Sequence, residues 1–372
     1  MSEASLDALS ALVECNIVSP AETQELRSCV HSIQMLVKNL GPAWQVRPFG
    51  SSANGFCMKG ADLDVTCFKK NAENGLEALH ELKTKLVPLL QQDPRFELKE
   101  AIWQARVPIL KLKFADLDVD LSCQNTEAIL NTELLKAYAK LHPKIRKLVI
   151  AVKIWAKSAG VNGAPRRHLS SYSWTLMVLY FLQVQQDLQL PCLPTAAFNL
   201  NSSPSFDNIQ WSCRMSLPQL LDRFFSFFTY EFQWGSEVVS VRLGKRAEIR
   251  SQEFKQLPGQ AVWRLHVEDP FLLNRNLNCV LGSQQESELQ AAINSASWEM
   301  SAGQVPESLR GQLMLNFLTS KSSPASASTV STNAGSFDGE EVYALSQAAP
   351  DPQHLPKTKL AAFAPNNHFL SS

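Results

Sequence analysis

Two aspartates at alternate positions and a preceding Gly-Ser pair are the residues of this sequence best suited to phosphoryl chemistry. Asp62-Leu63-Asp64-Val65 follows Phe49-Gly50-Ser51 after ten intervening residues. Side chains at i and i+2 of a strand project from one face, so the two carboxylates would lie side by side. The strand-like run that ends at Ser122 carries further aspartates, and one of them on a neighbouring strand would complete a cup of three carboxylates.

This set of oxygen donors predicts a site for Mg²⁺ or Mn²⁺. Hard divalent cations bind carboxylate and substrate phosphate oxygens together. In a two-metal site one ion activates the attacking hydroxyl while the other stabilises the leaving pyrophosphate. The Gly50-Ser51 turn allows backbone N–H groups and a hydroxyl to approach a triphosphate closely. An isolated Asp-x-Asp pair is more commonly a solvated strand edge, but the full spaced set favours the metal site.

Positive charge is concentrated in one stretch of a chain that has no net charge. Lys plus Arg and Asp plus Glu number 35 each, yet no acidic residue lies between Glu133 and Asp187. Such a local excess indicates contact with phosphates, although a solvated helix face has the same composition. Lys153 and Lys157 are four residues apart and share a helix face, which suits neighbouring phosphates of one triphosphate. The nine basic residues of the stretch are Lys136, Lys140, Lys144, Arg146, Lys147, Lys153, Lys157, Arg166 and Arg167.

The elements expected around the aspartates form a small α/β or α+β domain. Residues 3–40 are predicted to be helical, and a leucine-rich helix is predicted at 76–90. Strand-like runs begin at Trp44 and occupy 62–67, 96–99 and 107–122. In the last run Asp116, Asp118 and Asp120 would point to one side of a strand and the intervening apolar residues to the other.

After Asn125 the pattern becomes almost wholly helical. Helices are expected at 127–140, 143–159, 171–187, 217–229, 273–281 and 305–318, with a short strand at 237–243. The residues from 319 to 372 are rich in Ser, Ala, Pro, Thr and Asn and predict a disordered tail. The domains expected are an N-terminal helical segment packing on the core (1–40), a catalytic domain (41–125), a helical domain (126–318) and the tail (319–372).

Composition excludes several classes of protein. Apolar residues make up 45% of the chain and charged residues 19%, which fits a globular protein and excludes wholesale disorder or a fibrous repeat. The longest strongly apolar stretch, 174–182, is far short of the roughly 20 residues that span a bilayer, and no signal or transit peptide is visible. Eight scattered cysteines without a Cys-x-x-Cys pair favour ordinary thiols in a reducing compartment. We expect a soluble protein of the cytoplasm, with the nucleus as the alternative.

Further short motifs accompany the aspartates in one order along the chain. They are Phe49-Gly50-Ser51 with Asp62-Leu63-Asp64, Ala105-Arg106-Val107-Pro108-Ile109, Val119-Asp120-Leu121, Asn131-Thr132, Val152-Lys153-Ile154-Trp155-Ala156-Lys157, Leu169-Ser170-Ser171-Tyr172, Tyr230-Glu231-Phe232 and Val267-Glu268-Asp269-Pro270-Phe271. In this order they resemble the Cid1-like terminal nucleotidyltransferases, the cytoplasmic poly(A) polymerases and terminal uridylyltransferases of the DNA polymerase beta superfamily. The resemblance runs from about Phe49 to Leu281, which is most of the chain expected to fold.

The resemblance implies a bilobal α+β enzyme with a nucleotide cleft between its lobes. A small mixed-sheet catalytic lobe would face a mainly helical PAP-associated lobe. The implied reaction is template-independent transfer of UMP or AMP from UTP or ATP to an RNA 3′ end, with release of pyrophosphate. The implied partners are thus RNA and a nucleoside triphosphate, with Mg²⁺ or Mn²⁺ as the cofactor and no membrane.

Site residues follow from the resemblance position by position. The family's third carboxylate lies between hydrophobic residues on a strand that Asn follows, which matches Asp120, with Asp118 as the fallback. The catalytic and metal-binding residues implied are therefore Asp62, Asp64 and Asp120. The implied nucleotide contacts are Gly50 and Ser51 at the triphosphate, Asn131 at the ribose, Lys153, Lys157 and Ser171 at the phosphates, Tyr172 under the base, and Asp269 and Arg275 at the base edge.

Two departures from the family leave base choice open. Leu272 stands where many relatives carry Glu, and Arg275 stands where uridine-selective members often have His. No zinc finger or RNA-recognition motif is visible, so RNA selection would depend on the basic surface or on a protein partner. The alternatives are a nucleotidyltransferase with a non-RNA acceptor and an RNA-binding scaffold with an inactive catalytic lobe. The clustered aspartates argue against the scaffold, because like charges repel each other without a metal.

Overall fold

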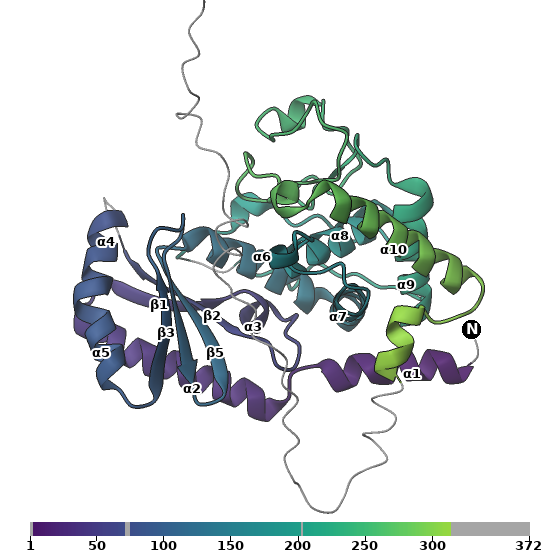
Figure 1. The fold of residues 1–372 in the computed structure, drawn as a ribbon. Helices are drawn as coiled ribbons and strands as arrows, with labels where there is room; N and C mark the ends of the chain where they lie inside the picture. Colours follow the sequence, from purple (N-terminus) through teal and green to yellow (C-terminus); the bar gives the residue numbers. More distant parts are fainter. Residues whose placement is uncertain (1–2, 71–74, 202–203, 314–372) are drawn as a thin grey trace, which may run out of the picture.

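The chain folds into two lobes that lie side by side (Figure 1). A computed structural model describes residues 3–70, 75–201 and 204–313. The tail expected at 319–372 lies outside these residues. Among the described residues, no helix has the length and apolar character needed to cross a membrane.

The first lobe is built on a five-stranded mixed sheet, as the α+β prediction requires. The strands are ordered β1-β2-β5-β4-β3, and β2 and β5 are parallel while the other neighbours are antiparallel. The parallel pair therefore lies inside the sheet, between β1 and β4. The strands are β1 (Trp44–Phe49), β2 (Leu63–Lys69), β3 (Phe96–Ile102), β4 (Ile109–Phe114) and β5 (Leu117–Cys123).

The single strand expected at 107–122 is wrong, because the chain reverses within it. β4 and β5 form a hairpin in which Phe114 faces Leu117. Ala115 and Asp116 make the turn, with Ala115 at a φ of 52°. Asp116 thus lies outside the strand, and only Asp118 and Asp120 alternate on β5 as predicted. The apolar residues change from even positions (Leu112, Phe114) to odd positions (Leu117, Val119) across this turn, and that shift by one residue is the only mark that the sequence carries of it.

Alternation does place the aspartates of β2 and β5 opposite the core of this lobe. Leu63, Val65 and Cys67 are fully buried and pack with the helices that cover the other face of the sheet. Those helices are α2 (Pro20–Val37) and the continuous helical stretch α4 (Gly75–Glu81), η2 (Leu82–Leu86) and α5 (Val87–Gln92). Asp62 and Asp64, at the alternate positions, face the second lobe.

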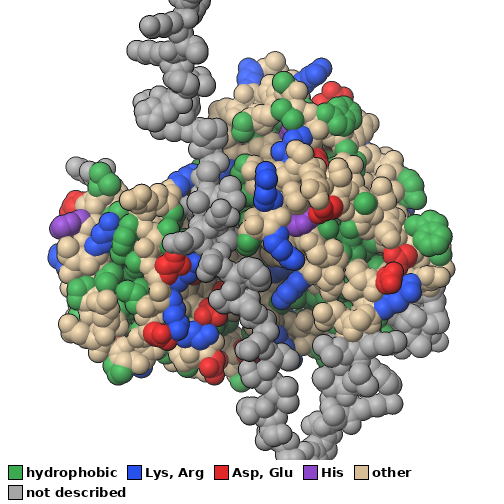
Figure 2. Space-filling model, in the orientation of Figure 1, with side chains coloured by type: hydrophobic (Ala, Val, Ile, Leu, Met, Phe, Trp, Pro, Cys, Tyr) green, Lys and Arg blue, Asp and Glu red, His purple; other side chains and the backbone are tan. Residues whose placement is uncertain are grey.

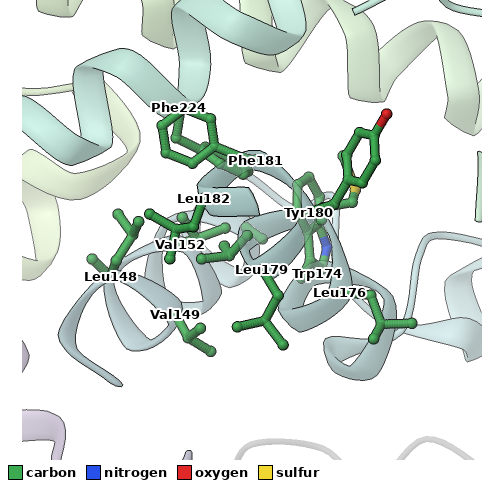
Figure 3. Packing of buried hydrophobic residues seen from close by; sticks show 14 of the residues in the cluster. Leu148, Val149, Val152, Trp174, Leu176, Leu179, Tyr180, Phe181, Leu182 and Phe224 are labelled. Carbon is green, nitrogen blue, oxygen red and sulfur yellow. The ribbon is translucent and has the colours of Figure 1, made fainter. Parts of the chain in front are cut away.

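The second lobe is almost entirely helical and has an aromatic core. Its long helices are α6 (Thr126–Leu141), α7 (Pro143–Ser158), α8 (Ser171–Val184), α9 (Leu217–Ser226) and α10 (Ser283–Ser301). Figure 3 shows Phe181 of α8 next to Phe224 of α9, and their ring centroids lie 5.8 Å apart, edge to face. Trp155 meets Trp174 in the same way at 5.5 Å. These contacts fix α7, α8 and α9 against one another, so the residues that they carry toward the first lobe are held on a rigid support.

The last part of this lobe differs from the sequence-based prediction. The helix expected at 273–281 is only the short turn η7 (Leu277–Val280), and α10 was not predicted. Leu289, Ile293, Ala296 and Met300 of α10 are buried at helical spacing, but most of the other positions are Ser, Gln or Glu, which makes the stripe hard to see in the sequence. The strand expected at 237–243 is β6 (Val238–Val239), paired with β7 (His266–Val267). The helix expected at 305–318 is present from 307 to 313, where the description ends.

The N-terminal segment contacts both lobes. The helix α1 (Glu3–Asn16) packs on α7 and α9, whereas α2 packs on the sheet. Between these helices Ile17 pairs with Met58, and the Lys59 N–H donates to the Asn16 carbonyl at 2.9 Å. The helical prediction for 3–40 is confirmed as two helices. The short segment that connects them is hydrogen-bonded to the loop that leads to Asp62.

Candidate active site

A cleft of about 1090 Å³ separates the two lobes and receives side chains from both. Figure 2 shows that Lys, Arg, Asp and Glu side chains of the two lobes gather where the lobes meet. All three predicted catalytic aspartates line this cleft, as do all the predicted nucleotide-binding residues except Asp269. The residues in question are Asp62, Asp64, Asp120, Gly50, Ser51, Asn131, Lys153, Lys157, Ser171, Tyr172 and Arg275.

The parallel pairing of β2 and β5 brings two of the aspartates together. Asp64 and Asp120 are facing partners in this pairing. Asp118 is two residues before Asp120, is exposed, and forms an ion pair with Lys113 at 3.1 Å. Asp118 does not line the cleft, whereas Asp120 does. The structure thus favours Asp120 over Asp118 as the partner of Asp64.

Gly50 is held against Asp64 by a turn that suits glycine alone. Its φ is +68°, in the region that side-chain-bearing residues avoid, and a Cβ at this position would collide with the Asp64 carboxylate. The Gly50 N–H donates to the Thr132 hydroxyl of α6 at 3.0 Å. The second lobe therefore fixes the turn that presents Ser51 next to the carboxylates. Thr132 belongs to the Asn131-Thr132 motif but had no predicted role.

The carboxylates suit a metal that is bound jointly with substrate phosphates. Among the described residues, no three His, Cys, Asp or Glu side chains converge closely enough to hold a metal ion by themselves. Mg²⁺ is commonly bound by one or two carboxylates together with phosphate oxygens and water. The facing pair Asp64 and Asp120 supplies that donor set, and the space that Gly50 leaves beside Asp64 keeps the approach open.

Asp62 lies at the rim of the same cleft and its charge is affected by both lobes. Although the side chain is exposed, loss of surrounding water and the neighbouring Asp118 raise the pKa of Asp62, while Lys113 and Lys157 oppose this rise. Lys157 is on α7 of the opposite lobe. A positive charge of the second lobe therefore acts directly on a carboxylate of the first.

Lys153 is a buried cation at the bottom of the cleft. Its side chain is 8% exposed, and its Nζ donates to the Phe56 carbonyl at 3.0 Å. Burial lowers the pKa of Lys153 to about 8, and the Cys57 thiolate would raise it. Phe56 is itself held by Asn54, whose Oδ1 accepts from the Phe56 N–H at 2.9 Å. Lys153 is thus positioned by the turn that follows Gly50 and Ser51.

Lys157 and the start of α8 add positive potential to the same end of the cleft. Lys157 is one helical turn from Lys153 and is exposed to the cleft. The N-cap Ser170 accepts a hydrogen bond from the Ser173 N–H, and the Ser171 hydroxyl donates to Asn162 at 3.3 Å. A helix N-terminus attracts anions because its first N–H groups and its dipole point outward. The predicted phosphate-binding residues therefore occupy one end of the cleft.

Tyr172, Asn131 and Asp269 form a chain of hydrogen bonds. The Tyr172 hydroxyl donates to Asn131 Oδ1 at 2.7 Å, and Asn131 Nδ2 donates to Asp269 Oδ2 at 3.4 Å. Burial, followed by the charge of Asp269, raises the pKa of Tyr172 well above its ordinary value, so the phenol stays protonated and donates. These two hydrogen bonds fix the Tyr172 ring on the cleft wall between α6 and α8.

Asp269 is placed behind the wall of the cleft and not on its surface. The side chain is fully buried, and its Oδ1 accepts from the N–H groups of Phe271 and Leu272 at 3.0 and 3.1 Å. The second carboxylate oxygen accepts from Asn131 and lies 3.9 Å from the Arg275 guanidinium. In this arrangement Asp269 contacts Asn131 and Arg275, which do line the cleft, so it is suited to orienting them.

Only two of the basic residues of α6 and α7 line the cleft. Lys153 and Lys157 line the cleft, whereas Lys147 pairs with Glu14 of α1 at 2.6 Å. Lys136 pairs with Glu133 at 3.6 Å, and Lys144 donates to the carbonyls of Cys213 and Met215 at 2.7 and 2.8 Å. These three of the nine basic residues predicted to contact phosphates therefore contact other groups of the protein.

Comparisons with known proteins match both lobes. A family model described as poly(A) RNA polymerase, mitochondrial-like, central palm domain matches residues 7–140, and one described as Cid1 family poly A polymerase matches residues 216–275. Cid1 poly(U) polymerase with Mg 3′-dATP bound has a TM-score of 0.69 and 25% identity, over 84% of this chain and 98% of that one. The chain belongs to the Cid1-like terminal nucleotidyltransferases. A mutant Cid1 bound to MgATP gives a TM-score of 0.71.

Similar sequences in this family include both uridylyltransferases and poly(A) polymerases. Human terminal uridylyltransferase 7 is 31% identical over 294 residues, which are 73% of this chain and 19% of that protein. Poly(A) RNA polymerase GLD2-A of Xenopus laevis is 31% identical over 266 residues, or 65% of this chain and 50% of that protein. The chain thus spans from about a fifth to half of the length of these relatives.

Proposed function

We propose that this chain is a template-independent RNA 3′-terminal nucleotidyltransferase that adds UMP or AMP from UTP or ATP. The observation that carries the proposal is the facing pair Asp64 and Asp120, which shares one cleft with Lys153, Lys157 and the start of α8. A carboxylate pair opposite phosphate-binding groups is the arrangement that transfer from a triphosphate needs. The family includes enzymes named for each of the two nucleotides.

In the proposed reaction the cleft residues have two tasks, which are to bind the nucleotide and to position the reacting groups. Lys153, Lys157 and Ser171 hold the triphosphate, and Tyr172 stacks under the base with Asn131 at the ribose. A divalent ion, Mg²⁺ or Mn²⁺, when bound by Asp62, Asp64 and Asp120 with phosphate oxygens, supplies Lewis-acid chemistry at the α-phosphorus. The RNA 3′-oxygen forms a bond to the α-phosphorus, its proton passes to water, and the bond to the leaving pyrophosphate breaks.

The remaining parts of the proposal concern location and RNA choice. The eight cysteines are free thiols in the structure, which supports a reducing compartment such as the cytoplasm. The engaged charges of α6 and α7 support the view that a protein partner contributes to RNA selection.

The deciding experiment supplies the purified chain with a labelled RNA oligonucleotide, Mg²⁺ or Mn²⁺, and each of the four nucleoside triphosphates in turn. We expect stepwise lengthening of the RNA with UTP and ATP, and none with an Asp64→Ala variant. Lengthening by neither nucleotide, with pyrophosphate released when a protein or small-molecule acceptor replaces RNA, would favour the non-RNA alternative. RNA binding without any pyrophosphate release would favour the scaffold.

A further inference from the structure

The cleft has a second end beyond the predicted phosphate-binding groups. Leu76 and Leu79 of α4 line this end together with Trp103, Arg106 and Pro108 of the loop between β3 and β4. These side chains are apolar or aromatic apart from the Arg106 guanidinium. They match no part of a triphosphate, which suggests a different portion of the substrates.

The pairing of the strands places this end on the far side of the carboxylates from the phosphate-binding groups. The chain leaves β1 at Phe49, opposite Asp64, and reaches Gly50 and Ser51 beyond the amino end of β2. The Pro108 carbonyl, in contrast, accepts from the N–H of Cys123 at 3.0 Å, three residues beyond Asp120. At a rise of about 3.3 Å per residue, this end begins roughly 10 Å from Asp120.

Trp103 is held at this end by the helix that precedes β3. The Nζ of Lys83 lies 4.7 Å from the centroid of the Trp103 ring. Leu76, Leu79 and Lys83 are spaced by three and four residues, so they share one helix face. A cation–π contact fixes the orientation of the ring, and the ring remains half-buried on the wall of the cleft.

Arg106 brings a cation to the same place from an exposed loop. Within the part of the chain that the structure describes, its guanidinium makes no hydrogen bond or ion pair. Although the Cys279 side chain is exposed, loss of surrounding water raises its pKa, and the charges of Arg275 and Arg106 oppose that rise. Arg275 belongs to the second lobe, so both lobes present a guanidinium near this end. Glu127 of α6 also lines the cleft.

We propose that this wall, formed by Leu76, Leu79, Trp103 and Arg106, is a subsite for the RNA acceptor strand. A base at least two nucleotides upstream of the 3′-terminal nucleotide, beyond the reach of a dinucleotide, stacks on Trp103 and the leucines, and the adjoining phosphate pairs with Arg106. An aromatic ring beside a cation is the recurring platform for single-stranded nucleic acid. The inference rests on the proposed function, since it assigns the second substrate of the same site.

The test compares acceptors that do and do not reach the wall. With an RNA of about fifteen nucleotides, Trp103→Ala and Arg106→Gln should each raise the apparent KM for RNA roughly tenfold. With a dinucleotide acceptor the same variants should behave as wild type, and the KM for UTP should not change. Fluorescence anisotropy with labelled RNA and no nucleotide gives a second measurement: Arg106→Gln should reduce the slope of log affinity against log salt by about 0.7.

Matched controls are available outside the cleft. Trp298 is 67% exposed on α10 and Arg250 is exposed on the second lobe, so Trp298→Ala and Arg250→Gln should change neither measurement. Trp103→Phe keeps a ring that can stack, so its RNA affinity should be close to that of wild type. This variant shows whether a loss of affinity in Trp103→Ala comes from the missing ring or from misfolding. If the Trp103 and Arg106 variants match the controls while wild type extends RNA, the subsite is overturned and the function stands. RNA binding that depends on Trp103 and Arg106, without any nucleotide addition, overturns only the function.

Discussion

The Oδ1 atom of Asp118 lies 3.1 Å from Nζ of Lys113, whereas Asp120, two residues further along β5, faces Asp64 across the parallel pairing. The two aspartates share one strand and one side-chain face, yet only one of them lines the cleft. The difference separates a surface ion pair from a candidate metal ligand.

The first prediction uses Asp118 as a matched control for Asp120. Asp120→Ala should lower nucleotide addition by at least roughly 100-fold, as should Asp62→Ala and Asp64→Ala, because each removes a carboxylate proposed to bind the metal. Asp118→Ala should lower it by less than about threefold, since an exposed ion pair contributes little. Single-turnover rates with labelled RNA measure the effect, and thermal unfolding checks that the variants fold. Loss of activity in Asp118→Ala with retention in Asp120→Ala would reverse the assignment.

The second prediction concerns the pH dependence of nucleotide binding through Lys153. Its pKa is lowered from 10.5 to about 8, so the charged form is lost as the pH rises through 8. Since kcat/KM reports the free enzyme, kcat/KM for UTP should fall above about pH 8. Lys153→Met has no amine to titrate, and its kcat/KM should be lower at neutral pH without this decline. The ratio of the wild-type kcat/KM to the variant kcat/KM, measured between pH 7 and pH 9.5, isolates the titration of Lys153. A ratio that stays constant over this range would contradict the prediction.

The third prediction separates the ring of Tyr172 from its hydroxyl. Tyr172→Ala removes the surface proposed to stack under the base and should raise the KM for nucleotide roughly 5- to 150-fold, the equivalent of about 1–3 kcal/mol. Tyr172→Phe keeps the ring and loses only the 2.7 Å hydrogen bond to Asn131, so its KM should rise by less than about tenfold. Equal effects of the two substitutions would show that Tyr172 acts through Asn131 alone.

Much of the catalytic lobe could be predicted from sequence because its polar and apolar residues alternate strictly. The alternation of Leu63, Val65 and Cys67 with the aspartates gave the correct face of β2, and the lysines of α7 share the predicted face. The hairpin at Ala115 was not predicted because the turn has only two residues and neither is Gly, Pro or Asn, so a one-residue shift of the apolar positions is its only mark. The helix α10 escaped because its apolar stripe is narrow and its other positions are polar.

The site was harder to predict where it depends on contacts between distant segments. Asp269 and Asn131 lie 138 positions apart, and no local pattern shows that the aspartate is buried behind the asparagine. Thr132, which fixes Gly50, and Trp103, which is fixed by Lys83, likewise gain their roles only from the packing of the lobes and helices. Arg106 was part of a motif that supported the family resemblance, but no sequence pattern gave this residue a role of its own.

The fourth prediction concerns base choice at Arg275. Tyr172 can stack under any base, so selection has to come from groups at the base edge. Arg275 lies 3.9 Å from Asp269, which holds the guanidinium near the cleft wall, and a guanidinium only donates hydrogen bonds. It can therefore donate to a uracil carbonyl, while its long and flexible side chain can turn away from a purine.

For these reasons we expect UTP and ATP both to be used, with UTP slightly preferred. Arg275→His should shift the ratio of kcat/KM values toward UTP, because the more rigid imidazole would restrict the space available to a purine. Strict use of ATP by wild type, or an unchanged ratio in the variant, would show that Arg275 does not set base choice.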